Sequence, residues 1–314
     1  KVQNLSMPKA LKTIVPLIPA YLKKGDSVLV IGTARHKSLK EITSGIRVLE
    51  SWGLVVIPGQ HLLNQWHQFC GTDAQRTQDL QWAINHPKAK AVFLLGGGYG
   101  TLRIIDGVSS KKLRLFPKWF IGFSDVTVLH AWLFHSGIAS IHGPMVFQLN
   151  SKSANTTHLR KVVFGKKADL KLPPHPLNRN GISEGFLYGG NLSILYALSG
   201  SRESVPLHQP IILFIEDLDE YLYHIDRMML QLKRSRQLHQ LKGVLIGTFT
   251  DMKDNALPFG ANAYSIIHAA LKDFNYPVCF GIPSGHGKIH ASLKLGAMVR
   301  INVQPKRVQI QYLT

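Results

Sequence analysis

The chain has 314 residues, of which 45% are hydrophobic and 18% charged, a composition that excludes disordered, collagen-like and coiled-coil proteins. Lys and Arg number 37 against 18 Asp and Glu, so the formal net charge is +19. A protein this basic can attract nucleic acid, an anionic surface or acidic small molecules. No apolar run approaches the roughly 18 residues that cross a bilayer, so we expect no membrane insertion.

Strand-like and helix-like segments alternate through the first half of the chain. Short apolar runs predict strands, and longer stretches with apolar residues on one face predict helices. Strands that alternate with helices predict a doubly wound, mostly parallel α/β sheet, whose ligands gather at the carboxyl ends of the strands. In chain order we predict strand 27–32, helix 39–52, strand 54–57, helix 76–85, strand 91–95, helix 102–108, strand 119–122 and helix 126–134.

Polar and basic residues with three prolines break this pattern between about residues 150 and 184. We therefore interpret 1–150 as an N-terminal α/β domain, 151–184 as a linker and 185–314 as a smaller, β-rich C-terminal domain. In this last part we predict strands over 211–215, 244–250, 299–303 and 308–312, with helices over 191–198 and 226–236.

Several kinds of site are not expected. The two cysteines, Cys70 and Cys279, lie far apart and exclude a disulfide framework. The histidines show no metal-ligand spacing, so neither a metal nor another cofactor is expected. Lys and Arg are scattered without a nucleic-acid motif, so no nucleic-acid partner is expected. Prolines interrupt the apolar stretch 14–21, which makes cytoplasm the default compartment unless a leader has been removed.

A glycine-rich loop, GGGYGT at 96–101, follows the predicted strand 91–95. Glycines before a helix let backbone N–H groups converge on an anion. The spacing matches neither the dinucleotide fingerprint nor a phosphate-binding P-loop. A tight turn and a cradle for an anion or oxyanion are therefore both open interpretations of this loop.

Ser124 follows the predicted strand 119–122 and opens the helix 126–134. A strand, a sharp turn with serine and a helix form the layout of a nucleophile elbow. Val126 stands where that motif has its second glycine, and a serine at a helix start is also an ordinary N-cap.

Acidic residues concentrate after the predicted strand 211–215, and one histidine lies in a glycine-flanked loop. Glu216 ends that strand, and His286 lies in the string PSGHG at 283–287. We predict Ser124 as nucleophile, His286 as its base and Glu216 as the group that orients the imidazole. Backbone N–H groups near Gly98, Tyr99 and Asp125 are the predicted oxyanion hole. Such a set performs acyl transfer to water.

Eight strings across the chain resemble the LD-carboxypeptidases, also called murein tetrapeptide carboxypeptidases, a family of serine peptidases. They occur in family order and span nearly the whole chain. The strings are YLKKGDSVLVIGTAR (21–35), GTDAQRTQDL (71–80), GGGYGTLRIID (96–106), IGFSDVTVLH (121–130), IHGPM (141–145), GGNLSIL (189–195), FIEDLDEYLYHIDRMMLQL (214–232) and GIPSGHG (281–287).

The resemblance implies a serine, histidine and glutamate triad that matches Ser124, His286 and Glu216. It implies a nucleotide-binding-like α/β domain with the serine, a smaller β-rich domain with its partners, and a homodimer. The implied reaction releases terminal D-alanine from cytoplasmic murein tetrapeptides during cell-wall recycling. It also suggests that Arg103, Glu184 and Asn191 lie near the substrate.

Two positions depart from the family pattern. Gly96 stands where an arginine is usual, and Phe123 stands where a tyrosine precedes the serine. The loss of the arginine removes an anion contact or a structural ion pair, which concerns the substrate contacts more than the chemistry. One branch of the family keeps the triad but cleaves peptidyl or aminoacyl nucleotide antibiotics and so confers immunity.

Three functions follow from these observations, in descending order. The first is the LD-carboxypeptidase, the second is the immunity-type hydrolase, and the third is a non-enzymatic protein that binds a polyanion. An ordinary α/β-hydrolase fits less well, because it requires the G-x-S-x-G elbow and one continuous sheet.

Overall fold

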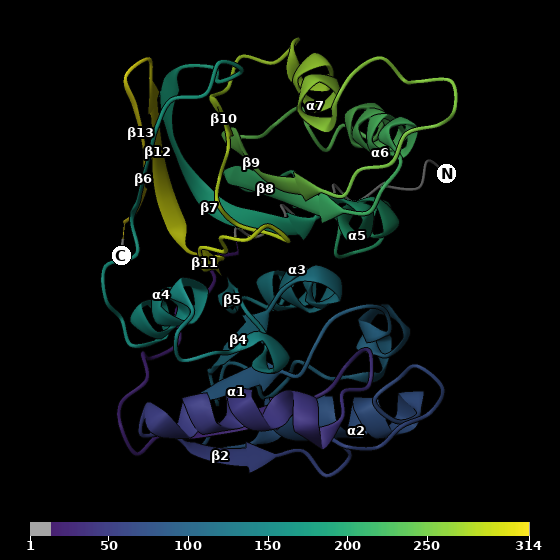
Figure 1. Ribbon diagram of the computed structural model, residues 1–314. Coiled ribbons are helices and arrows are strands. Elements are labelled where there is room, and N and C mark those ends of the chain that lie inside the picture. Colours follow the sequence, from purple (N-terminus) through teal and green to yellow (C-terminus); the bar gives the residue numbers. More distant parts are fainter. Residues whose placement is uncertain (1–13, 314) are drawn as a thin grey trace, which may run out of the picture.

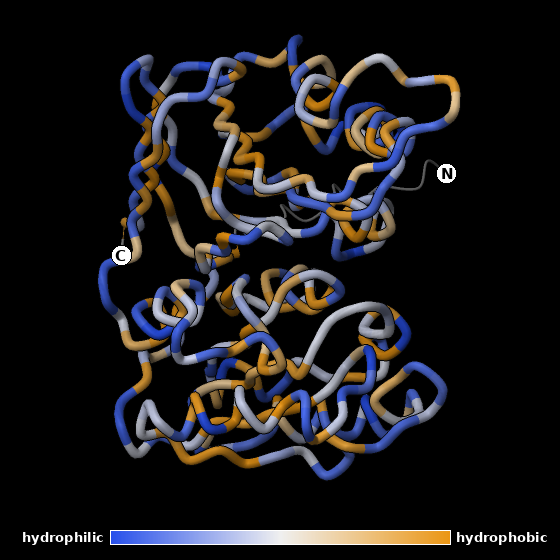
Figure 2. The backbone as a smooth tube through the Cα atoms, viewed as in Figure 1, coloured by the Kyte–Doolittle hydropathy of each residue, from blue (hydrophilic) through white to orange (hydrophobic). Residues whose placement is uncertain are grey.

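The protein forms two stacked lobes, each built on its own sheet, in a computed structural model that describes residues 14–313 (Figure 1). The first half of the chain makes most of the lower lobe in that view, which we call the first lobe. Most of the remainder makes the second lobe. Figure 2 shows apolar residues concentrated along the strands in the interior of each lobe and hydrophilic residues in the outer loops.

The first lobe contains the predicted doubly wound sheet. Its six strands run in the order β11-β5-β4-β3-β1-β2, and β1 to β5 are parallel. The middle strands are buried on both faces, which explains their continuous apolar sequences. The strands are β1 (Ser27–Ile31), β2 (Val55–Pro58), β3 (Ala91–Leu94), β4 (Trp119–Gly122) and β5 (Ser140–His142), with helices α1 (Leu39–Ser51), α2 (Asp73–Asn85), α3 (Thr127–His135) and α4 (Ala154–Val163).

The sixth strand of this sheet comes from far along the chain. β11 (Leu293–Leu295) pairs antiparallel with β5 at the edge of the first sheet. The first lobe therefore depends on residues from the last tenth of the chain to complete its sheet.

The second lobe has a seven-stranded sheet in the order β10-β9-β8-β7-β12-β13-β6. Its first four strands are parallel, so this part is an α/β sheet with an antiparallel extension. The strands are β6 (Leu170–Leu172), β7 (Gly181–Asn191), β8 (Ile211–Leu218), β9 (Gly243–Thr250), β10 (Val278–Phe280), β12 (Met298–Gln304) and β13 (Arg307–Tyr312), and the helices are α5 (Leu192–Ala197), α6 (Leu222–Arg234) and α7 (Ala263–Leu271).

The range 151–184 holds more regular structure than a linker pattern indicates. It contains α4, β6 and the start of β7. Helix α4 packs its apolar residues into the core of the first lobe, whereas β6 pairs with β13 in the second. The chain thus passes between the lobes here, and the exact domain limits stay a prediction.

The stretch 102–108, predicted as one helix, forms two short 3-10 turns instead, Thr101–Arg103 and Ile105–Gly107. An α-helix nucleates poorly in so few residues. The Asp125 carboxylate also holds the first of these turns by accepting a hydrogen bond from the Thr101 N–H at 2.8 Å.

Helix α3 lies between the two sheets and joins the cores of the lobes. All its residues from Thr127 to Phe134 are buried. Ala131 and Phe134 pack into the core of the second lobe, and the Phe134 ring meets that of Tyr188 edge to face at 5.1 Å. A helix that is apolar on all sides is suited to this place, and it fixes the two lobes relative to each other. No helix among residues 14–313 is long and apolar enough to cross a membrane.

Candidate active site

Ser124 lies at the turn between β4 and α3, at the carboxyl end of a parallel strand. Its backbone has a φ of 62°, in the left-handed region that residues other than glycine rarely adopt. Strain of this kind concentrates at functional sites, where the surrounding structure enforces it. The strain is typical of a nucleophile elbow, and the missing second glycine at Val126 has not prevented it.

Glu216 and His286 are joined by a hydrogen bond. The Glu216 carboxylate is fully buried at the bulged end of β8, and its Oε2 lies 2.7 Å from Nδ1 of His286. Burial raises the pKa of Glu216, but the imidazoles of His142 and His286 outweigh this effect and lower the pKa to about 2. The carboxylate is therefore ionised at neutral pH and orients the His286 ring.

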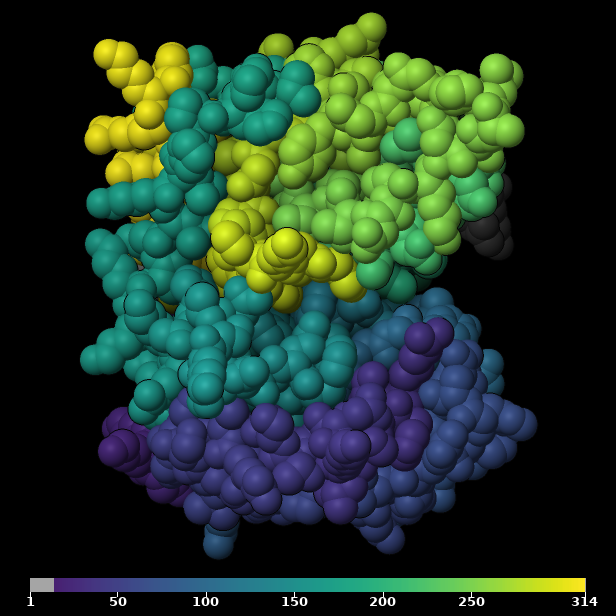
Figure 3. Space-filling model, in the orientation of Figure 1, coloured from purple at the N-terminus to yellow at the C-terminus, as the bar shows by residue number. Residues whose placement is uncertain are grey.

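Ser124 and His286 line one cavity of about 470 Å³, and residues from both lobes form its walls. In Figure 3 the surface is indented between the lobes. Among the described residues no hydrogen bond joins Ser124 Oγ to His286, and the Phe123 ring packs against the imidazole at 4.7 Å between centroids. Catalytic hydrogen bonds are often long in free enzymes and tighten when substrate binds.

The glycine loop lies directly beside Ser124. A Cβ atom placed on Gly97 would lie 3.2 Å from Ser124 Oγ, so the main chain of the loop approaches the serine closely. Gly98 and Asp125 line the cavity, whereas the Tyr99 side chain is exposed and does not. The main chain of the loop therefore borders the serine, beside which the oxyanion is predicted to form.

The Asp125 side chain has a structural contact that the sequence interpretation did not anticipate. Its buried Oδ2 accepts the Thr101 N–H, which ties the end of the glycine loop to the serine turn. Burial raises the pKa of Asp125. Buried Arg76 secures the other side of the loop by donating to the carbonyls of Thr33 and Gly100.

Of the three predicted substrate contacts, the structure brings one to the cavity. Asn191 lines it, caps α5 and donates to Asp217 at 2.8 Å. Arg103 does not line it and forms an ion pair with Asp73 at 2.6 Å. Glu184 also lies outside it, on β7, 3.7 Å from Arg300.

The sequence interpretation missed two buried histidines next to Glu216. His142 ends β5, and its Nε2 lies 3.9 Å from Glu216 Oε1. Its Nδ1 lies 3.3 Å from Nε2 of His290, whose pKa burial lowers well below the usual value. The position of His142 at the carboxyl end of a parallel strand was a signal that could have identified it.

The cavity also has charged residues that the sequence analysis did not select. Arg35 and Lys37 line it from the loop after β1, and Asp217 and Asp219 from the end of β8. Burial, followed by the neighbouring Glu216, raises the pKa of Asp217 to about 7. Within residues 14–313, no group of three or more His, Cys, Asp or Glu is arranged to hold a metal ion.

Comparison with known proteins identifies the family. The family model described as LD-carboxypeptidase N-terminal domain matches residues 28–143, and the LD-carboxypeptidase C-terminal domain matches residues 184–301. The chain belongs to the LD-carboxypeptidase family. The expected fold and the expected class of enzyme, a serine carboxypeptidase, are both confirmed.

Individual relatives agree along nearly the full length. A putative carboxypeptidase of Synechocystis is 33% identical over 95% of this chain and 96% of its own. A probable murein peptide carboxypeptidase of Bacillus subtilis is 32% identical over 93% of this chain and 94% of its own.

Solved structures share the fold of this LD-carboxypeptidase family member. The muramoyltetrapeptide carboxypeptidase of Oxalobacter formigenes has a TM-score of 0.83 and 28% identity, covering 91% of this chain and 98% of its own. MccF in complex with glutamyl sulfamoyl guanosine also has a TM-score of 0.83, covering 95% of this chain and all of its own. Its identity is 20%, so this second likeness concerns the fold alone.

Proposed function

We propose that the protein hydrolyses the L,D bond before the terminal D-alanine of murein tetrapeptides, with Ser124, His286 and Glu216 as its catalytic triad. The observation that supports this most is the 2.7 Å hydrogen bond between Glu216 and His286 at a cavity that the strained Ser124 also lines. The names of the relatives from Bacillus subtilis and Oxalobacter formigenes support the substrate class.

The proposed reaction proceeds in two halves. Ser124 Oγ attacks the carbonyl carbon before D-alanine, while Nε2 of His286 accepts the serine proton. The Glu216 carboxylate accepts the hydrogen bond from Nδ1–H and stabilises the charged imidazolium. His286 then donates its proton to the leaving amine, and D-alanine departs. In the second half His286 deprotonates a water molecule that attacks the ester between Ser124 and the peptide. The bond from the carbonyl carbon to Oγ then breaks, His286 returns the proton to Ser124 Oγ, and the shortened peptide departs.

The oxyanion that forms in both halves needs donors beside Ser124. Backbone N–H groups of the glycine loop and of Asp125 are suited to this role, because both line the cavity at the serine. Donors held in advance stabilise the transition state without reorganisation, and loss of one such donor typically costs about 100- to 1,000-fold in rate. The tether from Asp125 to Thr101 keeps the loop in place.

One incubation tests the reaction. Purified protein is mixed with free murein tripeptide, tetrapeptide or pentapeptide, and the products are measured by mass spectrometry. We expect the tetrapeptide alone to lose one D-alanine. An aminoacyl sulfamoyl adenylate in a parallel reaction tests the immunity-type activity. Cleavage of that compound, with an intact tetrapeptide, would contradict the proposal.

The proposal extends to a cytoplasmic homodimer without a nucleic-acid partner, as the family resemblance implies. Light scattering of the purified protein is expected to give twice the mass of one chain. Cell fractionation of the source organism is expected to recover the protein with the cytoplasmic enzymes. A monomer, or recovery with the envelope, would contradict the corresponding part.

A further inference from the structure

A carboxypeptidase must recognise the end of its substrate, and the described residues offer one well-placed group for that purpose. We propose that Arg35 binds the terminal carboxylate of the substrate through its guanidinium group. This inference rests on the proposed function, because it concerns the same cavity. It specifies which group of the substrate the enzyme recognises, the free α-carboxylate of the residue that follows the scissile bond.

Arg35 lies across the glycine loop beside Ser124. Its backbone N–H donates to the Gly97 carbonyl at 3.2 Å, and its side chain lines the cavity. Gly98 has a φ of 104°, and a Cβ atom on it would lie 2.6 Å from Arg35 Cδ. Position 98 therefore favours glycine because of its backbone conformation, and the absence of a side chain there leaves room for this arginine.

Ser124 and Arg35 lie against neighbouring residues of the glycine loop. Ser124 approaches Gly97, and the Arg35 side chain approaches the adjacent Gly98. Ser124 and the Arg35 side chain therefore contact consecutive residues of one loop, which brings the nucleophile and the cation to the same cavity. The terminal carboxylate of a substrate is one residue beyond the scissile carbonyl.

The Arg35 guanidinium is available to an incoming anion. Among residues 14–313 it forms no ion pair, and its one side-chain hydrogen bond runs from Nε to Gln68 Oε1 at 3.4 Å. The N–H groups on the two terminal nitrogens of the guanidinium are therefore free to bind both oxygens of a carboxylate.

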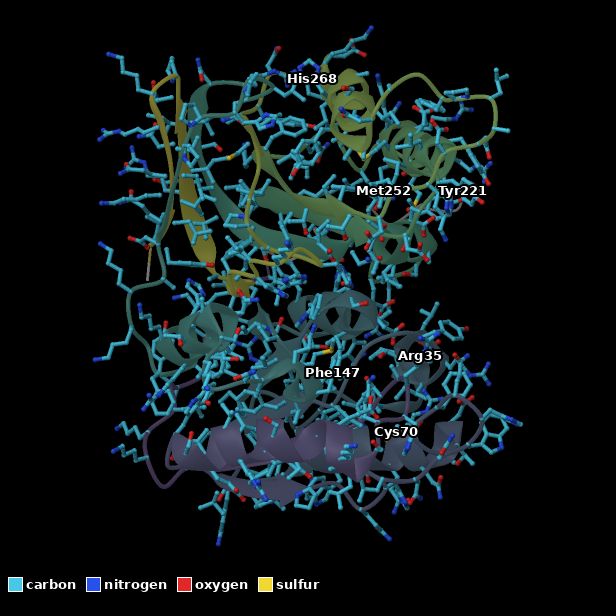
Figure 4. The ribbon with its side chains drawn as sticks, viewed as in Figure 1. Arg35, Cys70, Phe147, Tyr221, Met252 and His268 are labelled. Atoms are coloured by element: carbon cyan, nitrogen blue, oxygen red, sulfur yellow. The ribbon has the colours of Figure 1, made fainter. Side chains whose placement is uncertain are left out.

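The other charged side chains at the cavity already have partners. Lys37 pairs with Glu41 at 3.0 Å and lies over the Phe147 ring. Across the cavity, Asp219 pairs with Lys253 at 2.8 Å. Arg35 is thus the cation of this cavity that lacks a carboxylate partner within the described part of the chain. In Figure 4 Arg35 is labelled on the first lobe, at the side of the molecule where Tyr221 and Met252 lie on the second.

The test compares two substrates that differ in one group, the murein tetrapeptide acid and its C-terminal amide. The variants are Arg35→Gln, which removes the charge, and Arg35→Lys, which keeps the charge without the fork. Arg47→Gln is the matched control, because it changes the net charge by the same amount as Arg35→Gln. Arg47 is exposed on α1 and does not line this cavity.

We expect the wild-type enzyme to prefer the acid over the amide. Loss of a charged hydrogen-bonded contact in Arg35→Gln should lower kcat/KM for the acid about 10- to 100-fold, mostly through KM. The same variant should treat acid and amide alike. Arg35→Lys should retain part of the preference, and Arg47→Gln all of it. Wild-type kcat/KM in Arg35→Gln, or an unchanged preference for the acid, would overturn the inference.

Binding measurements separate this inference from the proposed reaction. Calorimetry on Ser124→Ala protein gives Kd for acid and amide, with and without Arg35→Gln. If wild-type protein releases no D-alanine, the proposed function fails. A tighter Kd for the acid that disappears in Arg35→Gln would still support the carboxylate site. Equal Kd values for acid and amide, or no binding of either, would refute it.

Discussion

Ser124 combines a strained backbone with a small side chain, so its replacement by alanine tests directly whether it is the nucleophile. Ser124→Ala removes the nucleophile but changes no charge and little volume. We expect turnover to fall by several orders of magnitude, while the Kd for tetrapeptide and the circular dichroism spectrum stay close to wild type. Turnover near the wild-type rate would assign the reaction to another group.

Glu216 acts through the ring of His286, so its replacement should affect the rate more than binding. In Glu216→Gln the amide keeps the shape of the side chain but cannot stabilise the imidazolium. We expect kcat to fall by about 10³- to 10⁴-fold with little change in KM.

Asp273→Asn makes the same charge change at an exposed side chain that pairs with Lys233 and does not line the cavity. Its kcat should stay within a few-fold of wild type. Similar kcat values for the two variants would contradict the role given to Glu216.

At the scale of single residues, the sequence predicted those residues whose roles depend on a local sequence pattern. Ser124 follows a buried strand, Glu216 ends another, and His286 lies between glycines. In the structure Ser124 and His286 line one cavity, and a hydrogen bond joins His286 to Glu216. Arg35 and His290 have no comparable local signature. Their positions depend on contacts with loops and strands from distant parts of the chain, which no short pattern contains.

At the scale of elements, His130 joins α3 to the sheet that positions Ser124. Its Nε2 lies 2.8 Å from the Gly122 carbonyl and its Nδ1 lies 2.8 Å from Ser140 Oγ, so it connects the helix to β4 and to β5. Burial lowers the pKa of His130 to about 3. The unfolded chain, with an ordinary histidine pKa near 6.5, takes up this proton first as pH falls.

The sign of the pH effect follows from this difference. Between about pH 6.5 and pH 3 the unfolded state binds more protons at His130 than the folded state, so acidification destabilises the fold. We expect the free energy of unfolding to fall by up to about 1.4 kcal/mol per pH unit for this group. Denaturant titrations of wild type and His130→Gln from pH 7 to pH 4 should show a smaller slope in the variant. Equal slopes would exclude His130 as the source.

Element predictions succeeded where periodicity was long and failed where tertiary contacts decide. Helices α1 and α6 have strong apolar faces, and both were expected from sequence. The stretch 102–108 lacks the length to sustain a helix, and the contact with Asp125 shapes it instead. Helices α4 and α7 and the long strand β7 were missed. The strands β5, β6, β10 and β11 were also missed, because three residues carry no measurable alternation.

At the scale of the whole molecule, the net charge of +19 should affect encounter with an acidic substrate. A basic protein attracts anions over a distance that added salt shortens. We expect kcat/KM for tetrapeptide to fall as the NaCl concentration rises from 20 to 500 mM, roughly the range over which screening becomes strong, while kcat changes less. Equal kcat/KM at both concentrations would exclude a steering role for the charge.

The break in the pattern near residues 150–184 predicted two units, but not how they are joined. Helix α3 was expected as part of a nucleophile elbow, and the structure also uses it as the packing surface between the sheets. Its all-round apolar sequence, VTVLHAWLF, indicated burial without indicating the partner. Long-range pairing of this kind depends on the complete fold, which local sequence does not encode.

The pairing of β11 with β5 has a consequence for biosynthesis. While the ribosome is still making the chain, the lobe with the nucleophile has an open sheet edge, since its last strand ends at residue 295. An unpaired edge of this kind invites association with other nascent chains. A prematurely terminated product that stops between residues 287 and 292 would keep every residue of the proposed triad, yet it would leave that edge uncovered.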